Sequence, residues 1–391
     1  MAPATAHPIA WALAVLLAAA ALTFFVVLPP IVDDRYNDVE PVAYAATERG
    51  QALHEKLLVV DLHADPMLWD RNLLKRTSRG HVDLPRLSDG NVALQVFSAV
   101  TKSPWGQNLE SNAGSSDRLI PLVIAHAWPP RTWFDIHERA LYQAERLRRT
   151  AEESGGRLVL VSTRAELDSL IVSKLRGDVV VGALLAMEGL HDLQNNPMRL
   201  RELVDAGYRM MAFTHFFDND LAGSAHGTRK GGLTVFGRQV VELMDSYGVV
   251  MDLAHVSEQS MDEILDMVSR PVVVSHTGAR GTCSSARNLS DQIIRRVAAT
   301  GGVIGIGYWE TAICGLSPRD IAATARYTAD LVGVDHVAIG SDFDGSVVTG
   351  LDASQHALVT SALLDFGFEE KEVAKIMGLN ALRVLRRVLP E

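Results

Sequence analysis

The sequence predicts a TIM-like (β/α)8 barrel preceded by an N-terminal transmembrane helix, and three observations lead to this fold class. Eight short runs rich in Val, Ile, Leu and Ala alternate with segments of helical periodicity. Such an alternation is typical of parallel strands that are buried on both faces. Most of these runs end in, or just before, a His, Asp or Glu residue, and the 391 residues are enough for one barrel with insertions.

The first element is a nearly uninterrupted apolar stretch from Pro8 to Val32. About 20 apolar residues span a bilayer, so this stretch fits a transmembrane helix. A cleaved signal peptide has a shorter apolar core, a basic start and a nearby cleavage site, whereas here Lys and Arg are absent before the stretch and Ala43-Tyr44-Ala45 lies well beyond it. We therefore favour an uncleaved anchor over a cleaved signal, and either over a buried core helix. The predicted domains are 1–34, the anchor or signal-like segment with its polar flank, and 35–391, the barrel.

The remaining elements follow in order after a polar linker at 33–47 and a short helix at 45–57. The predicted strands lie at 57–62, 91–100, 179–187, 208–214, 249–254, 272–275, 302–308 and 336–341. Helices are predicted at 117–150, 197–206, 233–247, 258–268, 289–300 and 318–331, and two or three more in the tail 352–391. The segment 101–157 is too long for a simple connection, so we expect a lid or an edge over the site. The apolar run at 158–162 has no assigned place in this scheme.

Charge and cysteine content narrow the class of protein. The chain has 37 Lys and Arg against 47 Asp and Glu, a net charge of −10, and no dense basic block, which argues against a nucleic-acid partner. Its two cysteines, Cys283 and Cys314, are too few and too far apart for a cysteine-based zinc site. They form either a disulfide or two separate buried thiols.

The ends of the predicted strands carry metal-ligand and acid–base side chains. They are His63 with Asp65, Glu188, His215, His255, His276, and Asp342 with Asp344. A turn with capping aspartates would explain the last pair alone, but not the whole set. In a barrel the carboxyl ends of all strands converge on one face, so we expect these side chains to meet. No ligand role is assigned to the histidines outside strand ends, which are His54, His81, His126, His137, His226, His336 and His356.

The ligand set is larger than one metal ion requires. A single ion takes four or five ligands, so the surplus predicts two ions joined by a bridging carboxylate. Glu188 is the candidate bridge because it is the lone carboxylate midway round the barrel. An imidazole-rich set without thiolates favours Zn over Mn, Co or Fe and disfavours Ca and Mg. Two cations that share one water would lower its pKa and present hydroxide to a carbonyl or phosphoryl centre.

The motifs at these strand ends resemble those of a known family. They are Asp61-Leu62-His63-Ala64-Asp65, Glu188-Gly189, Thr214-His215, Asp252-Leu253-Ala254-His255, Ser275-His276, Arg287-Asn288 and Gly340-Ser341-Asp342-Phe343-Asp344-Gly345. In this order they resemble the membrane (renal-type) dipeptidases of the metal-dependent amidohydrolase superfamily. The resemblance covers about residues 57–382 and leaves out the apolar N-terminal stretch.

The resemblance implies two zinc ions per subunit and a role for each matching residue. His63 and Asp65 would bind one ion, His255 and His276 the other, and Glu188 would bridge them. The implied substrate contacts are His215 at the carbonyl oxygen where negative charge develops, Arg287 at the C-terminal carboxylate, and Asp342 as a proton shuttle near the amino group. Asp344 would support the site from outside the ligand set.

The implied activity is hydrolysis of dipeptides by a metal-bridging hydroxide. The alternative is another amidohydrolase reaction on the same ions, with a lactam, an N-acyl amino acid or a phosphotriester as substrate. Arg287 argues against a neutral triester, which gives a guanidinium nothing to bind. A non-catalytic membrane-tethered binding protein would lack some ligands, and none is missing.

Two further expectations follow from the resemblance, and a third concerns the membrane. Cys283 and Cys314 should form a disulfide, as cysteines near these places do in exported relatives. Leu62, and the pair Phe216-Phe217 after His215, stand where relatives usually carry small or polar residues, so the neighbouring pocket should be more apolar than is usual. We expect the barrel to be membrane-anchored on the periplasmic or extracellular side, and the oligomeric state, a homodimer included, stays open.

Overall fold

The computed structural model describes residues 8–391 and confirms the predicted barrel. Its eight strands are β1 (Val59–Ala64), β2 (Val92–Val100), β4 (Val181–Glu188), β5 (Tyr208–Ala212), β6 (Val250–Asp252), β7 (Val273–Thr277), β8 (Val303–Ile306) and β9 (Val337–Ile339). All neighbouring strands are parallel, in the order β2-β1-β9-β8-β7-β6-β5-β4, and pairing of β2 with β4 closes the barrel. That closing register runs from Leu94 opposite Gly182 to Val100 opposite Glu188.

The apolar run at 158–162 forms an additional short strand, β3 (Leu158–Leu160). It pairs with the first residues of β4, from Val181 to Ala183, whereas β5 pairs with β4 only from Leu185 onward. This strand therefore pairs with the amino-terminal part of β4, before the part that pairs with β5, and takes no part in closing the barrel.

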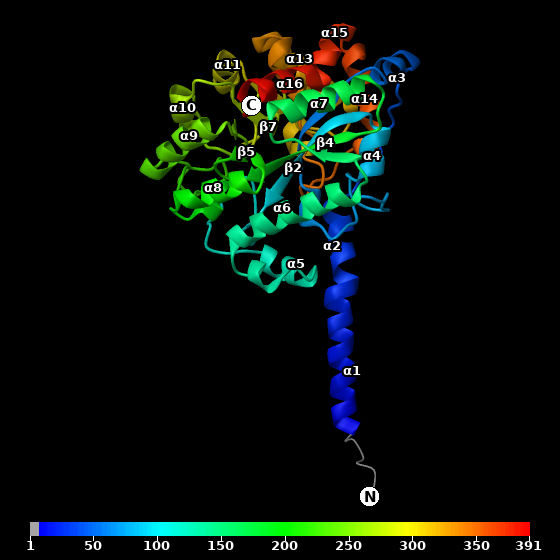
Figure 1. The fold of residues 1–391 in the computed structure, drawn as a ribbon, viewed down its shortest axis with the longest axis vertical. Helices are drawn as coiled ribbons and strands as arrows, with labels where there is room; N and C mark the ends of the chain where they lie inside the picture. Colours follow the sequence, from blue (N-terminus) through cyan, green and yellow to red (C-terminus); the bar gives the residue numbers. More distant parts are fainter. Residues whose placement is uncertain (1–7) are drawn as a thin grey trace, which may run out of the picture.

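Helices surround the strands on the outside of the barrel (Figure 1). They are α3 (Glu48–His54), α4 (Leu84–Asp89), α5 (Leu119–Ala125), α6 (Ile136–Glu153), α7 (Arg164–Leu175), α8 (Pro197–Asp205), α9 (Val235–Tyr247), α10 (Glu258–Met267), α11 (Asp291–Ala299), α12 (Glu310–Ile313) and α13 (Pro318–Val332). The tail adds the three helices α14 (His356–Asp365), α15 (Glu370–Ala374) and α16 (Asn380–Val388).

The single helix predicted at 117–150 is wrong, because two helices occupy this segment. Pro129 and Pro130 lie between α5 and α6, and proline removes a backbone donor and obstructs a continuing helix. Helix α6 then begins at Ile136, after the N-cap residue Asp135, whose side chain accepts hydrogen bonds from the backbone N–H groups of His137 and Glu138.

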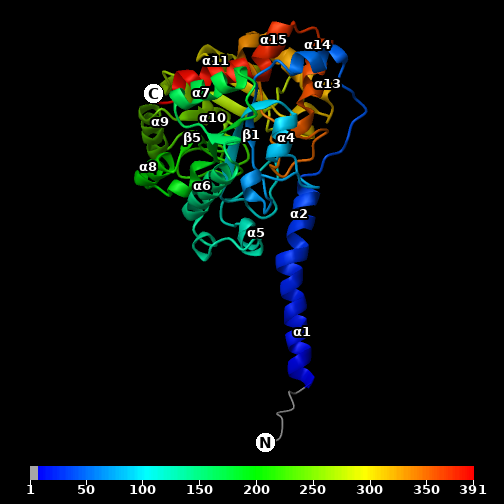
Figure 2. The ribbon, with the colours of Figure 1, turned by 45° about the vertical axis from the view of Figure 1, so that its right-hand side comes forward.

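The N-terminal residues form one long helix that extends away from the barrel (Figures 1 and 2). It comprises α1 (Pro8–Leu22), a π-helical turn (Thr23–Val27) and α2 (Leu28–Tyr36). The helical span Ile9–Tyr36 is 28 residues long, and its most apolar 18-residue window has a mean hydropathy of 2.6 and is not buried by the protein. The span is thus not a core helix, and it has the length and composition of a membrane anchor and equally of a signal sequence.

The end of this helix is fixed against the barrel, which corrects the polar linker predicted to begin at residue 33. Helix α2 continues to Tyr36, and Asp33 and Asn37 are buried. Asp33 forms ion pairs with Arg71 and Arg79, at 3.2 and 2.9 Å. Because a buried carboxylate is stable only when its charge is paired, these contacts define how the helix end is seated.

The two cysteines form a disulfide, as predicted. Cys283 and Cys314 are bonded across 31 positions of sequence, with their Cα atoms 5.4 Å apart. The bond joins the loop after β7 to the end of α12.

Candidate metal centre

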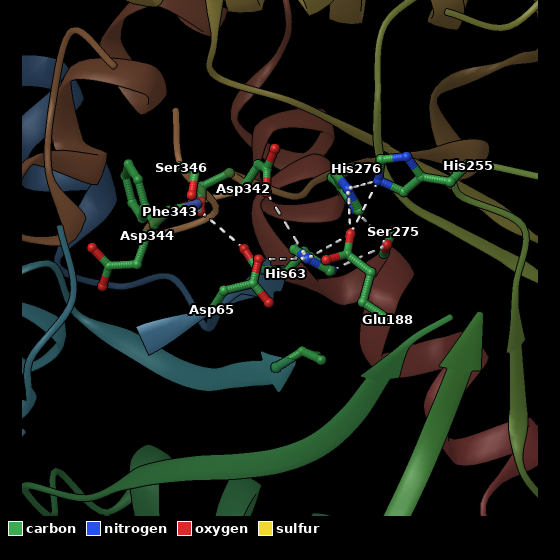
Figure 3. A network of polar contacts seen from close by, with 12 residues as sticks. His63, Asp65, Glu188, His255, Ser275, His276, Asp342, Phe343, Asp344 and Ser346 are labelled. Atoms are coloured by element: carbon green, nitrogen blue, oxygen red, sulfur yellow. Dashed lines mark hydrogen bonds and ion pairs between the residues drawn. The ribbon is translucent and has the colours of Figure 1, made fainter. Parts of the chain in front are cut away.

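The predicted strand-end residues meet around the carboxylate of Glu188, the last residue of β4 (Figure 3). Glu188 Oε1 lies 3.0 Å from His255 Nε2, 3.4 Å from His276 Nε2 and 3.5 Å from His63 Nε2. The second carboxylate oxygen, Oε2, lies 3.4 Å from His215 Nε2. One buried carboxylate therefore faces four imidazoles that come from four different strand ends.

The residues form two candidate metal sites that share Glu188. One site consists of His63, Asp65 and Glu188, and the other of Glu188, His215 and His255, with the potential ligand atoms of each set within 4.8 Å of one another. The two sites are buried and contiguous, as a binuclear centre requires.

His276 and His215 complete the second half of the cluster. The Nε2 atoms of His255 and His276 are 3.1 Å apart. Two nitrogen ligands on one tetrahedral ion, with bonds of about 2.0–2.1 Å, lie roughly 3.3 Å from one another, so this pair fits a shared ion. His215, for which we expected a substrate contact, is also close enough to count among the potential ligands.

Four buried atoms of the cluster make no hydrogen bond within residues 8–391, namely His63 Nε2, Asp65 Oδ1, His215 Nδ1 and His255 Nδ1. His63 and Asp65 belong to the same candidate metal site. Buried polar atoms are normally satisfied, because an unmade bond costs about 1–3 kcal/mol. A cation between the imidazole and the carboxylate would satisfy both, so the donor set fits a metal ion.

The electrostatics of the cluster favour a cation as well. Burial raises the pKa of Glu188 well above its usual range, and the neighbouring Asp65 raises it further. Burial, opposed by His63 and reinforced by Asp65, raises the pKa of Asp342 to about 8. These shifts mean that the carboxylates crowd one another in a medium that solvates charge poorly, and a divalent cation would relieve this.

Three histidines of the cluster, His215, His255 and His276, are held in the neutral form that binds metal. Burial lowers the pKa of His215, His255 and His276 well below the usual value, and Arg287 or neighbouring histidines add to the effect. A neutral imidazole offers one nitrogen lone pair, which is the form required of a metal ligand.

Ser275 and Asp252 determine which nitrogen of two histidines carries the lone pair. The Asp252 carboxylate can only accept, so the Ser275 hydroxyl donates to it. The lone pairs of Ser275 Oγ then accept from Nδ1–H of His276 at 2.8 Å and, more weakly, from Nδ1–H of His63 at 3.4 Å. With hydrogen on Nδ1, both Nε2 atoms face Glu188 as acceptors.

The backbone at the site is held in uncommon conformations. His255 and Asp342 both have φ near +62°, in the left-handed region that side chains other than glycine seldom adopt. Gly189, which follows Glu188, has φ +85°, and a Cβ there would lie 2.9 Å from the backbone N of His215. Such strained positions cluster where surrounding structure over-determines them, as at functional sites.

Asp344 points away from the cluster (Figure 3). Its carboxylate forms an ion pair with Arg71 at 2.7 Å and accepts from the backbone N–H of His81 at 2.7 Å. Arg71 also contacts Asp33, so this carboxylate connects the site's last loop to the seat of the N-terminal helix.

A cavity of about 430 Å³ leads from Glu188 to Arg287. The guanidinium is buried, donates to the carbonyl oxygen of His276 at 2.6 Å and lies over the Trp309 ring. Within the described part of the chain it has no carboxylate in ion-pair contact, so its charge is available to an anion that enters the cavity.

Asp252 and Ser275 support the site and were not predicted to do so. Asp252 lies three residues before His255, and Ser275 directly precedes His276. A polar residue just upstream of a ligand on a buried strand was the available signal.

The pocket beside the site was predicted to be more apolar because of Leu62 and Phe216. Leu62 is wholly buried in the core and lines neither cavity that reaches Glu188. Phe216 lines both cavities, so of these two residues only Phe216 makes the pocket more apolar.

Comparison with known proteins identifies the family of this chain. A family model described as membrane dipeptidase (peptidase family M19) matches residues 47–389. The chain belongs to the M19 family. It is accordingly a metallo-dipeptidase by family, with a buried cluster of His, Asp and Glu residues where a metal centre is required.

Proteins of similar sequence include two named as dipeptidases. The chain is 29% identical over 362 residues to dipeptidase tcpJ of Claviceps purpurea, covering 89% of this chain and 79% of the relative. It is 29% identical to dipeptidase verJ of Clonostachys rogersoniana, covering 79% and 76% of the two chains.

Two crystal structures share the fold. The probable dipeptidase PvdM of Pseudomonas aeruginosa superposes with a TM-score of 0.74 at 19% identity, over 88% of this chain and 98% of that one. A metallopeptidase of Rhodobacter sphaeroides, bound to a phosphinate mimic of the dipeptide L-Ala-D-Ala, gives a TM-score of 0.72 at 22% identity, over 85% and 99%.

Proposed function

We propose that this M19 protein is a membrane-anchored di-zinc dipeptidase that hydrolyses the single peptide bond of dipeptides. The observation that carries the proposal is the position of Glu188, whose carboxylate is shared by two buried groups of potential ligands. The dipeptide mimic bound by the Rhodobacter sphaeroides relative supports the substrate class.

His63 and Asp65 would hold one ion, His255 and His276 the other, and Glu188 both. The imidazole and carboxylate set, without thiolates, is one that suits zinc. When bound, the two cations supply a water with a pKa near neutrality and a positive charge that polarises the scissile carbonyl.

The chain's own residues would then bind the substrate and move the proton. Arg287, with its charge unpaired in the cavity, would bind the C-terminal carboxylate through a charge-assisted hydrogen bond. Neutral His215 would donate a hydrogen bond to the carbonyl oxygen as it gains negative charge. Asp342, in the same cavity, would accept a proton and pass it to the leaving amine.

The helix Ile9–Tyr36 would anchor this domain on the periplasmic or extracellular side of the membrane. The disulfide supports this side, because disulfides persist in oxidising compartments.

The test is a substrate panel with the zinc-loaded full-length protein in detergent. We expect hydrolysis of dipeptides with both termini free, and at least tenfold lower kcat/KM for their N-acetylated and C-amidated forms, as loss of one charged contact implies. L,L, L,D and D,D dipeptides in the same panel define the stereochemical preference.

Two outcomes would count against the proposal. Equal rates on blocked and free dipeptides would indicate a general amidohydrolase that acts on N-acyl amino acids or lactams. Full activity after removal of metal by a chelator would exclude the metal-dependent mechanism altogether.

A further inference from the structure

A second cavity, of about 300 Å³, lies between the metal centre and the N-terminal helix. The helix contributes a stripe of side chains at four-residue spacing, namely Phe24, Leu28, Val32 and Tyr36. Residues four apart lie on one face of a helix, and this face is turned toward the cavity. Its side chains are only partly covered, since Leu28 and Tyr36 are each 42% exposed. The volume is at the lower end of the range of about 300–1,000 Å³ found for small-molecule sites.

Helix α5 forms the opposite wall. Figures 1 and 2 place α5 on the side of the barrel from which the N-terminal helix extends, and α5 contacts that helix. Leu119 and Leu122 line the cavity from α5, and the Arg118 guanidinium lies over the Tyr36 ring where the two walls approach each other. The segment predicted to form a lid thus covers the site together with the helix.

The inner end of the cavity is the metal centre itself. Asp65, Glu188 and His215 line it there. The cavity that holds Arg287 adjoins this one, and both are lined by Gln107, Glu188, His215, Phe216, Gly345 and Ser346. It includes Asp342 in place of Asp65. The two cavities therefore meet at Glu188, one of them mainly apolar and the other containing the unpaired guanidinium.

We propose that the cavity between α2 and α5 binds a large apolar side chain on the N-terminal residue of the dipeptide, with the N-terminal helix as one wall of this subsite. This inference rests on the proposed dipeptidase function. A dipeptide whose C-terminal carboxylate is held by Arg287 and whose peptide bond lies at Glu188 extends its N-terminal residue beyond Glu188, away from the guanidinium. The apolar cavity is the space that adjoins Glu188 and does not include Arg287. The helix then has a role in specificity in addition to anchoring.

The test is a chain-length series measured with the full-length protein in detergent. The substrates are X-Gly dipeptides in which X is alanine, 2-aminobutyrate, norvaline, norleucine or 2-aminooctanoate, and the reversed Gly-X set. We expect kcat/KM to rise about fourfold per methylene in the X-Gly series until the cavity is filled, which corresponds to about 0.8 kcal/mol per buried methylene. The Gly-X series should show no such rise.

Two variants with neighbouring controls locate the effect in the cavity. Val32→Asn and Leu122→Asn place a polar group against the substrate chain and should flatten the X-Gly series, measured as the ratio of kcat/KM for the norleucine substrate to kcat/KM for Ala-Gly. Ile31→Asn and Ile120→Asn alter adjacent residues that do not line the cavity and should keep the wild-type slope. Leu122→Ala should move the preferred length toward longer chains, and it provides a milder variant if the asparagine substitution prevents folding.

Several results would overturn the inference and leave the proposed function intact. One is a flat X-Gly series with normal Ala-Gly hydrolysis, which is expected if a lipid chain fills the cavity. Another is a rise of kcat/KM in the Gly-X series instead of the X-Gly series. The third is a mature protein that mass spectrometry shows to lack residues 24–36. No hydrolysis of any free dipeptide, Ala-Gly included, would instead overturn the proposed function.

Discussion

Replacing Asp252 by asparagine should weaken metal binding although Asp252 is not among the residues proposed to hold an ion. Asp252 Oδ1 accepts from the backbone N–H groups of Ala254 and Ser275, at 3.0 and 2.9 Å, so in the variant the amide oxygen is held on that side. The amide nitrogen must then face Ser275 Oγ and donate to it. The Ser275 hydroxyl then donates to His276 Nδ1, which becomes an acceptor. The ring hydrogen of His276 therefore lies on Nε2, the atom whose lone pair would bind the metal.

The magnitude follows from this reversal of hydrogen bonds. Groups that orient a metal-bound histidine are worth about 10- to 100-fold in metal affinity, or roughly 1.4–2.8 kcal/mol. The substitution is isosteric, so the free energy of unfolding of the metal-free protein should fall by only about 1 kcal/mol, the value of one hydrogen bond.

The assay is zinc affinity by competition with a chromophoric chelator, with ¹⁵N chemical shifts of the histidine rings as a readout of the tautomer. Asp192→Asn is the matched control, because Asp192 is also buried and bonded to a histidine, His137, at 2.8 Å. The control should lose thermal stability and keep its zinc affinity. Wild-type zinc affinity in Asp252→Asn, or an unchanged His276 tautomer, would refute the reasoning.

Three other predictions test separate parts of the structure. Cys283→Ser removes a cross-link that spans 31 positions, and the loop-closure entropy of such a cross-link corresponds to about 3.7 kcal/mol of stability. The substitution should lower the Tm by about 4 °C in calorimetry, and an unchanged Tm relative to oxidised wild type would contradict this. Burial lowers the pKa of His137, but hydrogen bonds to carboxylates, Asp192 first, raise it overall. Protonated His137 therefore stabilises the folded protein fully below its pKa in the unfolded chain, and this stabilisation is lost as pH rises through its higher pKa in the folded protein. The Tm difference between wild type and His137→Gln should accordingly be larger at about pH 5.5 than at about pH 9. Arg287→Met should raise KM about 10- to 100-fold for free dipeptides and leave their C-terminal amides nearly unaffected, and equal effects on both would remove the assigned carboxylate contact.

The sequence predicted the barrel and its strand ends well because both depend on short-range patterns. Apolar runs of strand length identify parallel strands, and parallel strands in a barrel bring their carboxyl ends together without further information. Glu188 and His63 could therefore be placed in one cluster before any distance was known.

Features that depend on contacts between distant segments could not be predicted in this way. Asp33 reads as the start of a linker, since nothing near it in sequence indicates its ion pairs with Arg71 and Arg79. The hydroxyl of Ser275 acquires its role only through the carboxylate of Asp252 on the neighbouring strand. Leu62 is an unusual residue beside a ligand, but its burial in the core removes it from the pocket.

The central claim is that one carboxylate joins two metal sites, and metal content tests it most directly. Zinc bound per chain should be measured by elemental analysis on protein that is active on Ala-Gly, for wild type and for Glu188→Ala. We predict two ions per wild-type chain, and loss of at least one ion together with nearly all activity in the variant, because Glu188 lies within 3.5 Å of His63 and His255, in opposite halves of the site. Full activity with a single ion in wild type, or two tightly held ions and unchanged hydrolysis in Glu188→Ala, would contradict the account.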